Sequence, residues 1–511
     1  MTVANDDGEQ TFIPPFAQKY FTRETMEMYP ELKESMQKVL DTKGEDDSVW
    51  EAFVQHYDKF RNFEWRGNTG ATRYDIVFYG VSGYTGYLMM EYLKRVALRR
   101  EGQEPFTFAF AGRTAKKVQQ MRDREFAGTK WADTPILTAT FDDMFSMIDL
   151  ARSAHVIINV AGPYMLTQGE ILIDACIHLG THYVDISGEI PWSLRVMDLH
   201  QHALSKGVFV VPSAASAGGI PDLGVYLCAK EMREKHGEEL RHAACYQTGG
   251  GFKASASGGT LKTRAAMNEA GDDVRKKMGD PFALGGFIPD VDRWGIKSVN
   301  VEFGTGRVTA KPRQEDLDVN FTKVSEDKKL GIWRGPFIYS YFDTRIVRRS
   351  NMLFADLGDC PYGRRLNFME YALLPPDVAK DTSTMAKGKS VEEEKAALEA
   401  AGTYYKEGEG PPLDELSDAW TAWFMYADTE SGKEYKMSMM GKDGYFETAR
   451  VSVETAMCLR FDKEKLQFKG GVLNTTVACG TFLAQRLSDT GLRIRPGSWF
   501  EPSEYGPPPL A

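Results

Sequence analysis

The sequence predicts an α/β protein with a doubly wound parallel sheet and a second α+β domain. From residue 74 to residue 214, short runs of β-branched and aromatic residues alternate with longer amphipathic segments. Six such runs follow one another, separated by helical segments of roughly 10–20 residues, which is typical of βαβ units. A glycine-rich turn follows the first run. This combination favours a dinucleotide-binding sheet.

The expected elements follow directly from these runs. Strands are predicted at 74–80, 106–112, 135–140, 155–162, 182–187 and 208–214. Helices are predicted at 84–100, 114–124, 142–152, 167–180 and 192–206. A further helix is expected after Pro221, because proline fits the first turn of a helix.

The regular alternation ends after residue 215, which indicates a different kind of domain. Strand-like pieces and glycine-rich turns mix over 241–375, and strand-like runs return at 420–428 and 434–441. The run "PFIYSYFDTRIVRRS" (336–350) is expected to form a cationic strand. Such a strand would place Arg345 and Arg349 on one face and Arg348 on the other.

Length, charge and cysteine content limit the class of protein. The 511 residues carry a net charge of −10, which argues against general nucleic-acid binding. The six cysteines form no C-x-x-C pair, so free thiols in a reducing compartment are expected. The amino terminus lacks the apolar core of a signal peptide. We therefore expect a cytoplasmic protein, while peripheral membrane or lipid contact and homodimer formation stay open.

The glycine-rich turn carries the strongest chemical signal. The first glycine allows a sharp turn off the strand, the second lets the backbone approach a pyrophosphate, and the third lets the helix pack on the strand. The N–H groups that open the helix then receive the phosphates. The expected cofactor-binding residues of this turn are Gly80, Ser82, Gly83, Tyr84, Thr85 and Gly86.

Residues at the ends of the second and fourth predicted strands indicate which cofactor binds and where it lies. Arg113 and Thr114 stand where an NAD-specific site usually carries an acidic residue, and arginine accommodates a 2′-phosphate. This favours NADP(H), with an ordinary basic loop as the alternative. The turn Ala161, Gly162 and Pro163 follows the fourth strand, where the nicotinamide ribose should lie.

Catalytic and substrate-contacting residues are expected around the same sheet edge. Tyr164, Ser187 and Glu189 are candidates for positioning and proton transfer, although Tyr164 could equally pack beside the nicotinamide ring. Ser257 and Thr260 precede a helix in the second domain, and they form either an anion cradle or a tight helix start. Together with Arg345, they are the candidates for substrate contact.

No metal site is expected from the sequence. His178 and His182 are four residues apart, but Gly180 lies between them and should end the helix. The two histidines therefore need not share a face. There is also no H-E-x-x-H motif and no cysteine cluster.

Several motifs in a fixed order resemble the saccharopine dehydrogenase-like oxidoreductases, including the trans-acting enoyl reductase branch. They are "GVSGYTG" (80–86), "AGR" (111–113), "NVAGPY" (159–164), "THYVDISGE" (181–189), "SGGT" (257–260), "DTRIVRRSN" (343–351) and "GGVLNTTVACG" (470–480). Where the family often has Phe-Asp-Ser, this chain has Ala217, Gly218 and Gly219. The resemblance implies a Rossmann domain, an α+β substrate or dimerisation domain, and NADP(H)-dependent reduction of a small-molecule substrate.

The expected domain organisation has four parts. They are a helical N-terminal extension (1–73), a Rossmann NADP-binding domain (74–225), an α+β substrate or dimerisation domain (226–474), and a C-terminal helix with a tail (475–511). That helix, expected at 475–488, should return to the Rossmann domain. The apolar-poor segment 378–412 is expected to be an exposed insertion.

The expected function is exchange of hydride between NADP(H) and a C=N, C=O or C=C substrate. A wide apolar cleft would favour enoyl reduction of a lipid-like substrate, and a small arginine-lined pocket would favour an amino acid. A non-catalytic NADP-binding scaffold protein is the alternative from another class, because no unmistakable catalytic base stands out in the sequence.

Overall fold

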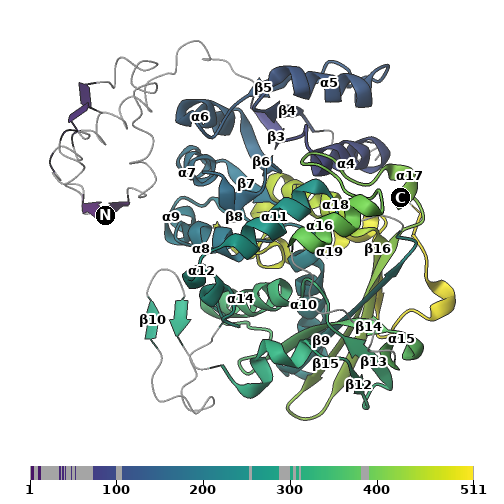
Figure 1. Cartoon of the computed structure of the whole chain (residues 1–511). Helices are drawn as coiled ribbons and strands as arrows, with labels where there is room; N and C mark the ends of the chain where they lie inside the picture. The colour runs from purple at the N-terminus through teal and green to yellow at the C-terminus, as the bar shows by residue number, and fades with distance from the viewer. Residues whose placement is uncertain are drawn as a thin grey trace.

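Two seven-stranded sheets with a group of helices between them make up the structure, a computed structural model (Figure 1). It describes residues 73–98, 106–252, 256–286, 312–380 and 391–509, together with short pieces of 2–52 and of 300–309. None of the helices in these parts is both long enough and apolar enough to cross a lipid bilayer.

The first sheet has the strand order of a dinucleotide-binding fold. From edge to edge its strands are β17 (Gly471–Val472), β8 (Phe209–Val211), β7 (His182–Asp185), β6 (Ala154–Asn159), β3 (Tyr74–Tyr79), β4 (Phe108–Gly112) and β5 (Ile136–Thr138). All neighbouring pairs are parallel. The chain starts at β3, adds β4 and β5 on one side, and then crosses to β6 on the other. This reversal confirms the predicted doubly wound sheet.

Both faces of this sheet are covered, as a parallel sheet requires. Side chains alternate along β3, so Ile76 and Phe78 join one apolar core while Val77 and Tyr79 join another. The first core includes α4 (Tyr84–Tyr92) and α5 (Ala115–Phe126). The second includes α6 (Met144–Arg152), α7 (Glu170–Leu179), α8 (Ile190–Met197) and α9 (His200–Ser205).

The second sheet is mixed. Its order is β12 (Ser325–Asp327), β13 (Ile332–Gly335), β14 (Asn367–Leu374), β9 (Leu240–Gly250), β15 (Trp420–Thr429), β16 (Glu434–Lys442) and β18 (Arg493–Pro496). Only β14 and β9 run parallel; the other neighbours are antiparallel. This mixed sheet confirms the expected α+β architecture.

Four long helices fill the space between the sheets. They are α10 (Ser216–His236), α14 (Ser340–Gly358), α18 (Gly444–Met457) and α19 (Thr475–Asp489). The helix α10 contacts the other three and β15, whereas α18 also contacts α4, β6 and β7 of the first sheet. One apolar core therefore runs continuously from the first sheet to the second. Shorter helices lie elsewhere: α11 (Gly258–Glu269), α12 (Asp272–Met278), α15 (Pro376–Lys380), α16 (Val391–Ala400) and α17 (Leu413–Leu416).

The predicted strand at 336–350 is wrong, because residues 340–350 belong to α14 and residues 336–339 form the turn before it. Nearly every residue of this helix from Ser340 to Phe354 is buried, including Arg345, Arg348 and Arg349. Charged residues are buried here together with apolar ones, although charged residues are usually exposed, so the run does not look like a core helix in the sequence. The alternating aromatic residues before it then give a misleading strand pattern.

The two ends of the chain do not divide simply into separate domains. Most of the predicted helical extension (1–73) lies outside the described residues, but β1 (Thr2–Ala4) and β2 (Gln10–Phe12) within it pair antiparallel. After the second sheet is formed, β17 returns to the first sheet and β18 joins the second. The C-terminal chain therefore contributes to both halves.

A buried polar network connects three of the central helices. The carboxylate of Asp222 on α10 accepts hydrogen bonds from Ser350 Oγ on α14 (2.7 Å) and from the hydroxyl of Tyr362 (3.0 Å). Asn474, at the start of α19, donates to the Ser350 hydroxyl (2.8 Å). Burial raises the pKa of Asp222 from 3.8 to about 7, even though these hydrogen bonds favour the ionised form.

The raised pKa of Asp222 predicts a stability that depends on pH. An acid with a higher pKa in the folded state binds its proton more readily when folded, so its contribution to stability is complete below about pH 4. This contribution is lost as the pH rises from about 4 to about 7. The free energy of unfolding from urea titrations should therefore fall less between pH 5 and pH 8 in Asp222→Asn than in wild type. Equal changes in the two proteins would contradict this prediction.

Candidate functional site

The glycine-rich turn after β3 has the geometry that the sequence predicts for its first and third glycines. Gly80 has a φ of 89°, and a Cβ there would lie 2.7 Å from the nitrogen of Ala161. A Cβ on Gly86 would lie 2.4 Å from Cα of Val81, so α4 could not pack this closely on the turn. Both positions require glycine for steric reasons.

The middle glycine leaves a surface open to a ligand. The nearest atom to a Cβ on Gly83 would be the Gly80 oxygen, 3.6 Å away, so no packing contact explains the glycine. Gly83 is the N-cap of α4, and the first N–H groups of this helix have no partner within it. Gly80 and the turn after β6 lie side by side where the strand order reverses. This arrangement fits a dinucleotide pyrophosphate at the helix start.

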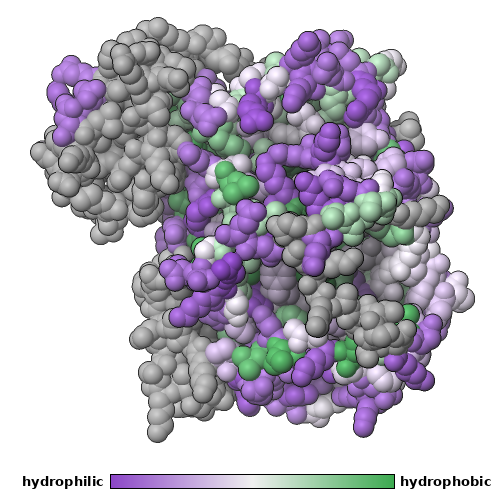
Figure 2. Space-filling view, viewed as in Figure 1, coloured by the Kyte–Doolittle hydropathy of each residue, from purple (hydrophilic) through white to green (hydrophobic). Residues whose placement is uncertain are grey.

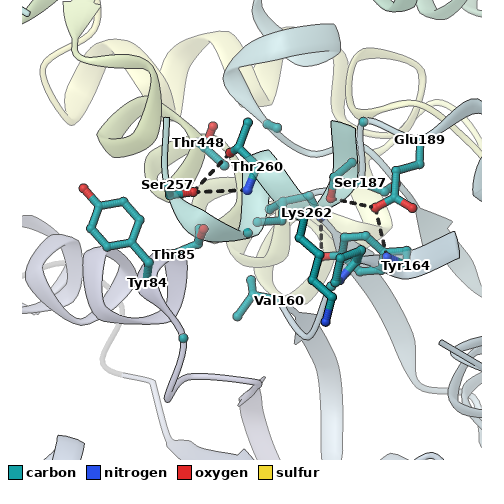
Figure 3. A pocket seen from close by; sticks show the side chains of 18 of the residues that line it. Tyr84, Thr85, Val160, Tyr164, Ser187, Glu189, Ser257, Thr260, Lys262 and Thr448 are labelled. Atoms are coloured by element: carbon teal, nitrogen blue, oxygen red, sulfur yellow. Dashed lines mark hydrogen bonds between the residues drawn. The ribbon is translucent and has the colours of Figure 1, made fainter. Parts of the chain in front are cut away.

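A large cleft opens from this turn to the second half of the chain, with a volume of about 1440 Å³ (Figure 3). It brings together most of the sequence-predicted site residues. Those that line it are Gly80, Ser82, Gly83, Tyr84, Thr85, Arg113, Ala161, Gly162, Pro163, Tyr164, Ser187, Glu189, Ser257 and Thr260. Three predicted residues do not line it: Gly86, Thr114 and Arg345.

Glu189 holds the loop that follows the Gly-Pro turn. Its two carboxylate oxygens accept hydrogen bonds from the backbone N–H groups of Tyr164 (2.9 Å) and Met165 (2.5 Å). The guanidinium of Arg195 donates to the carbonyls of Tyr164, Met165 and Thr167 from the other side. The sequence analysis missed Arg195, because nothing in its local pattern distinguishes it from a surface arginine of α8. Burial raises the pKa of Glu189.

Tyr164 is engaged inside the protein. Its hydroxyl donates to the carbonyl of Asn159 (2.8 Å), and its ring packs against Trp192 with 5.6 Å between centroids. Burial raises the pKa of Tyr164 well above its usual range. The hydroxyl is thus bonded to the backbone and the ring packs on Trp192, which argues against Tyr164 as a proton donor.

Asp185 is the last residue of β7, and Ser187 lies just beyond it. The buried carboxylate of Asp185 accepts from the Ser187 N–H (2.9 Å), from Trp192 Nε1 (2.9 Å) and from the Tyr183 hydroxyl (3.0 Å). These contacts fix the backbone at Ser187, whose Oγ lies 3.4 Å from Ser213 Oγ. Asp185 is thus a structural anchor, while Ser187 reaches the cleft.

The wall opposite the glycine turn comes from α11 and α18. Ser257 is the N-cap of α11, and its Oγ accepts from the Thr260 N–H, so this segment is a tight helix start (Figure 3). The Tyr445 hydroxyl accepts from the Ser257 N–H (2.7 Å), and its ring meets Tyr84 edge-on at 5.3 Å. Asp443 caps α18 by accepting from the Tyr445 and Phe446 N–H groups, which fixes Tyr445 in place. Tyr445 is not among the residues that the sequence analysis assigns to the site.

Part of the predicted insertion also reaches the cleft. Glu407, Gly408 and Glu409 line it, and Glu407 forms an ion pair with Lys262 at 2.6 Å. The Tyr84 hydroxyl donates to the carbonyl of Pro411 at 2.8 Å. Residues 407–411 therefore contact the glycine turn directly, although the preceding helix α16 is largely exposed.

Arg345 does not contact the cleft. Its side chain is fully buried, and its guanidinium forms a bidentate ion pair with Asp318 at 2.6 and 2.7 Å. This fork uses two of the five guanidinium donors, and the Thr344 hydroxyl and the Met278 carbonyl accept from the same two terminal nitrogens. Arg345 is therefore engaged in a buried ion pair, and we do not assign it to substrate binding.

The two histidines that are four apart in the sequence lie on different elements. His178 is in the last turn of α7, whereas His182 begins β7 after the left-handed Gly180. The Nδ1 of His182 accepts from the Phe209 N–H at 3.1 Å, and burial lowers its pKa to about 3. The pair is therefore not a metal site.

The strand order, the glycine turn and the position of the cleft define a Rossmann-type dinucleotide-binding protein. No family model matches the chain. A Mycobacterium tuberculosis protein, named provisionally as a trans-acting enoyl reductase, is 29% identical over 443 residues, which are 83% of this chain and 97% of that protein. The trans-acting enoyl reductase of Mycobacterium ulcerans is 28% identical over 438 residues, or 82% and 97%. The resemblance predicted from the motifs is thus confirmed over most of the chain.

Solved structures give weaker matches. Saccharopine dehydrogenase from Saccharomyces cerevisiae is 13% identical with a TM-score of 0.44, covering 83% of this chain and all of that one. Homospermidine synthase from Legionella pneumophila, solved with NAD, is 9% identical with a TM-score of 0.45, covering 83% and 92%. These values are too low to support an argument, so the assignment of the fold rests on the strand order.

The hydrogen bonds of Glu189 predict how replacing its carboxylate by an amide changes the stability of the protein. In Glu189→Gln, the side chain keeps one acceptor, but its NH₂ group meets a backbone N–H. The variant should lose about 1–3 kcal/mol of unfolding free energy, because a buried donor is left without a partner. Urea unfolding measures this difference. The matched control Glu407→Gln breaks only an exposed ion pair and should change stability by less than about 1 kcal/mol. Equal losses in the two variants would contradict the prediction.

Proposed function

We propose that this protein is an NADP(H)-dependent reductase of the C=C bond of an enoyl substrate. The observation that carries the proposal is the similarity to proteins named trans-acting enoyl reductase over more than four fifths of the chain. The dinucleotide-type glycine turn at one end of the cleft supports it. The cofactor supplies the hydride. The protein binds and orients the cofactor and the substrate, and it excludes water from them.

The size of the cleft supports two ligands side by side. Typical pockets for a single small ligand enclose about 300–1,000 Å³, whereas this cleft encloses about 1440 Å³. A dinucleotide along the glycine turn would leave the space toward α11 and α14 for a second molecule. This fits a reductase better than a protein that binds the dinucleotide alone.

The rim of the cleft supports an apolar substrate. Among the described residues, five large apolar side chains are exposed, and three of these line the cleft: Leu166, Phe252 and Ile338, at 57%, 48% and 52% exposure. The molecular surface is otherwise mainly hydrophilic on the face seen in Figure 2, with separate hydrophobic spots. Apolar side chains gathered at a cleft mark a binding surface. They suit an acyl chain better than an amino acid.

The end of β4 supports NADP(H) as the preferred cofactor. Arg113 is exposed and lines the cleft with Lys117 of α5, one helical turn further on. Two cations at this place can pair with a 2′-phosphate, whereas the ribose of NAD usually meets an acidic residue. Thr114 lies outside the lining and is not assigned to the cofactor.

The remaining predicted residues divide by their contacts. Ser187 stays the proposed donor of a proton to the substrate, because it follows the carboxyl end of β7 and is among the residues that line the cleft. Glu189 is a positioning residue, since both its oxygens are used by the backbone of the Gly-Pro loop. Tyr164 shapes the wall. Ser257 and Thr260 are proposed to contact the substrate or the phosphates from the opposite side.

Removal of Arg113 tests the cofactor proposal. Arg113→Ala should weaken NADPH binding by about 10- to 150-fold, because a charge-assisted hydrogen bond contributes about 1.5–3 kcal/mol, and should leave NADH binding unchanged. Fluorescence titration of both cofactors measures this. Lys116→Ala is the matched control, since Lys116 is three residues away in the first turn of α5, is exposed and does not line the cleft. Equal affinity of the wild type for NADPH and NADH would refute the proposal.

The enoyl specificity is tested by the substrate series. NADPH oxidation should occur with 2-enoyl thioesters and give the saturated thioester by mass spectrometry, and it should not occur with ketone or imine substrates. Leu166→Ser should raise KM several-fold for a long-chain enoyl thioester and leave KM for a four-carbon one unchanged. Turnover of only ketones or imines would replace the enoyl assignment. Silence with all three classes would favour a scaffold protein over an enzyme.

A further inference from the structure

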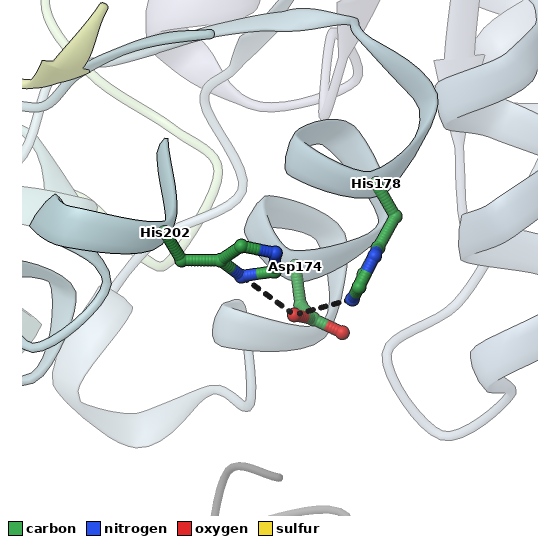
Figure 4. A group of neighbouring side chains, drawn as sticks. All are labelled: Asp174, His178 and His202. Atoms are coloured by element: carbon green, nitrogen blue, oxygen red, sulfur yellow. Dashed lines mark ion pairs between the residues drawn. The ribbon is translucent and has the colours of Figure 1, made fainter. Parts of the chain in front are cut away.

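Three side chains that commonly bind metal ions meet on helices that cover the outer face of the first sheet (Figure 4). Asp174 and His178 belong to α7, and His202 belongs to α9. Asp174 Oδ1 lies 3.4 Å from Nε2 of His178 and 3.9 Å from Nδ1 of His202. One ligand atom from each of the three residues lies within 4.8 Å of the other two.

The local structure explains why these groups converge. Asp174 and His178 are four residues apart on one helix, so their side chains lie on the same face. The ring of His202 approaches from α9 and meets the ring of His178 at 4.7 Å between centroids, with 70° between planes. The three side chains are only 17–20% exposed. They are held in place by their surroundings and can still be reached from solvent.

We propose that Asp174, His178 and His202 form a binding site for a divalent transition-metal ion such as Zn²⁺. Imidazole nitrogen and carboxylate oxygen are suitable ligands for this class of ion. Bonds of about 2.0–2.1 Å in a tetrahedral site place ligand atoms about 3.3 Å apart. The two separations from Asp174 Oδ1, 3.4 and 3.9 Å, are close to this. The ligand atoms of the two histidines lie within 4.8 Å of one another, so side-chain rotations that bring the imidazoles together complete the site. A water molecule would take the fourth position.

A metal ion at this site would stabilise the fold and would not take part in the redox chemistry. None of the three residues lines the cleft. A bound ion would link α7 to α9, and both helices pack on the same apolar core as β3 and β6. The loop before α7 lines the cleft at Thr167 and Gln168. Metal binding would therefore stabilise the nucleotide-binding half, and the inference does not depend on the proposed function.

Titration of the chelator-treated full-length protein with Zn²⁺, against a chromophoric chelator, tests the site. Wild type should bind one ion per chain, and its thermal unfolding midpoint should rise by a few degrees. Asp174→Asn and His202→Phe each remove one ligand and keep the approximate size of the side chain. His202→Phe also keeps an aromatic ring against His178. Each should lower the affinity at least about tenfold. His236→Asn, at the exposed end of α10, is the matched control and should bind as wild type does.

A second measurement needs no variant. Chemical modification of histidines with diethyl pyrocarbonate, mapped by mass spectrometry, should show that Zn²⁺ protects His178 and His202 and leaves His236 reactive. Absence of stoichiometric binding by wild type would overturn the proposal. Unchanged Zn²⁺ affinity in both Asp174→Asn and His202→Phe would also overturn it, and so would equal protection of all three histidines. Asp174 and the histidines would then form only an ion pair.

Discussion

The buried polar junction between α10, α14 and α19 is the constraint on which the rest of the structure depends. Asp222, Ser350 and Asn474 satisfy one another across three helices in a region without solvent. A buried polar group that loses its partner costs about 1–3 kcal/mol, so these helices have one favourable register. Since the helices lie between the two sheets, this register also sets the position of one sheet against the other.

The cleft is a consequence of that arrangement. One wall is the carboxyl edge of the first sheet, where Gly80 and Gly83 leave the backbone bare. The opposite wall is formed by the starts of α11 and α18, and each start is fixed by its own N-cap, Ser257 or Asp443. Neither wall alone makes a site. Their distance is fixed by the shared core, which makes the cleft a property of the whole chain.

The two candidate sites use the first sheet in different ways. The cleft is at the carboxyl edge of the strands, where a ligand meets backbone N–H groups and loops. The cluster of Asp174, His178 and His202 is on helices that cover one face, where it could link α7 to α9 without reaching the cleft. Redox chemistry and metal binding would therefore be coupled only through the stability of the sheet.

The sequence by itself determined the first sheet, the glycine turn and the resemblance to enoyl reductases, because these depend on local patterns: apolar runs, glycines at fixed offsets and motifs in order. Residues whose roles arise from distant partners could not be found in this way. Arg345 and Arg349 sit in a cationic run that suggests a surface, yet one pairs with Asp318 and the other donates to the carbonyl of Val472. Only the tertiary structure could bury those charges, because their partners come from other parts of the chain.

Long-range packing also explains why His178 lies beside His202 and not beside His182. In the sequence His178 stands near His182, but Gly180 ends the helix and sends His182 into the sheet. The tertiary fold instead brings His202, 24 residues away in the sequence, to His178 and Asp174. Arg195 and Tyr445 likewise entered the candidate site only through contacts with loops from elsewhere. Local pattern determined the elements of the first sheet, and long-range packing decided which side chains meet.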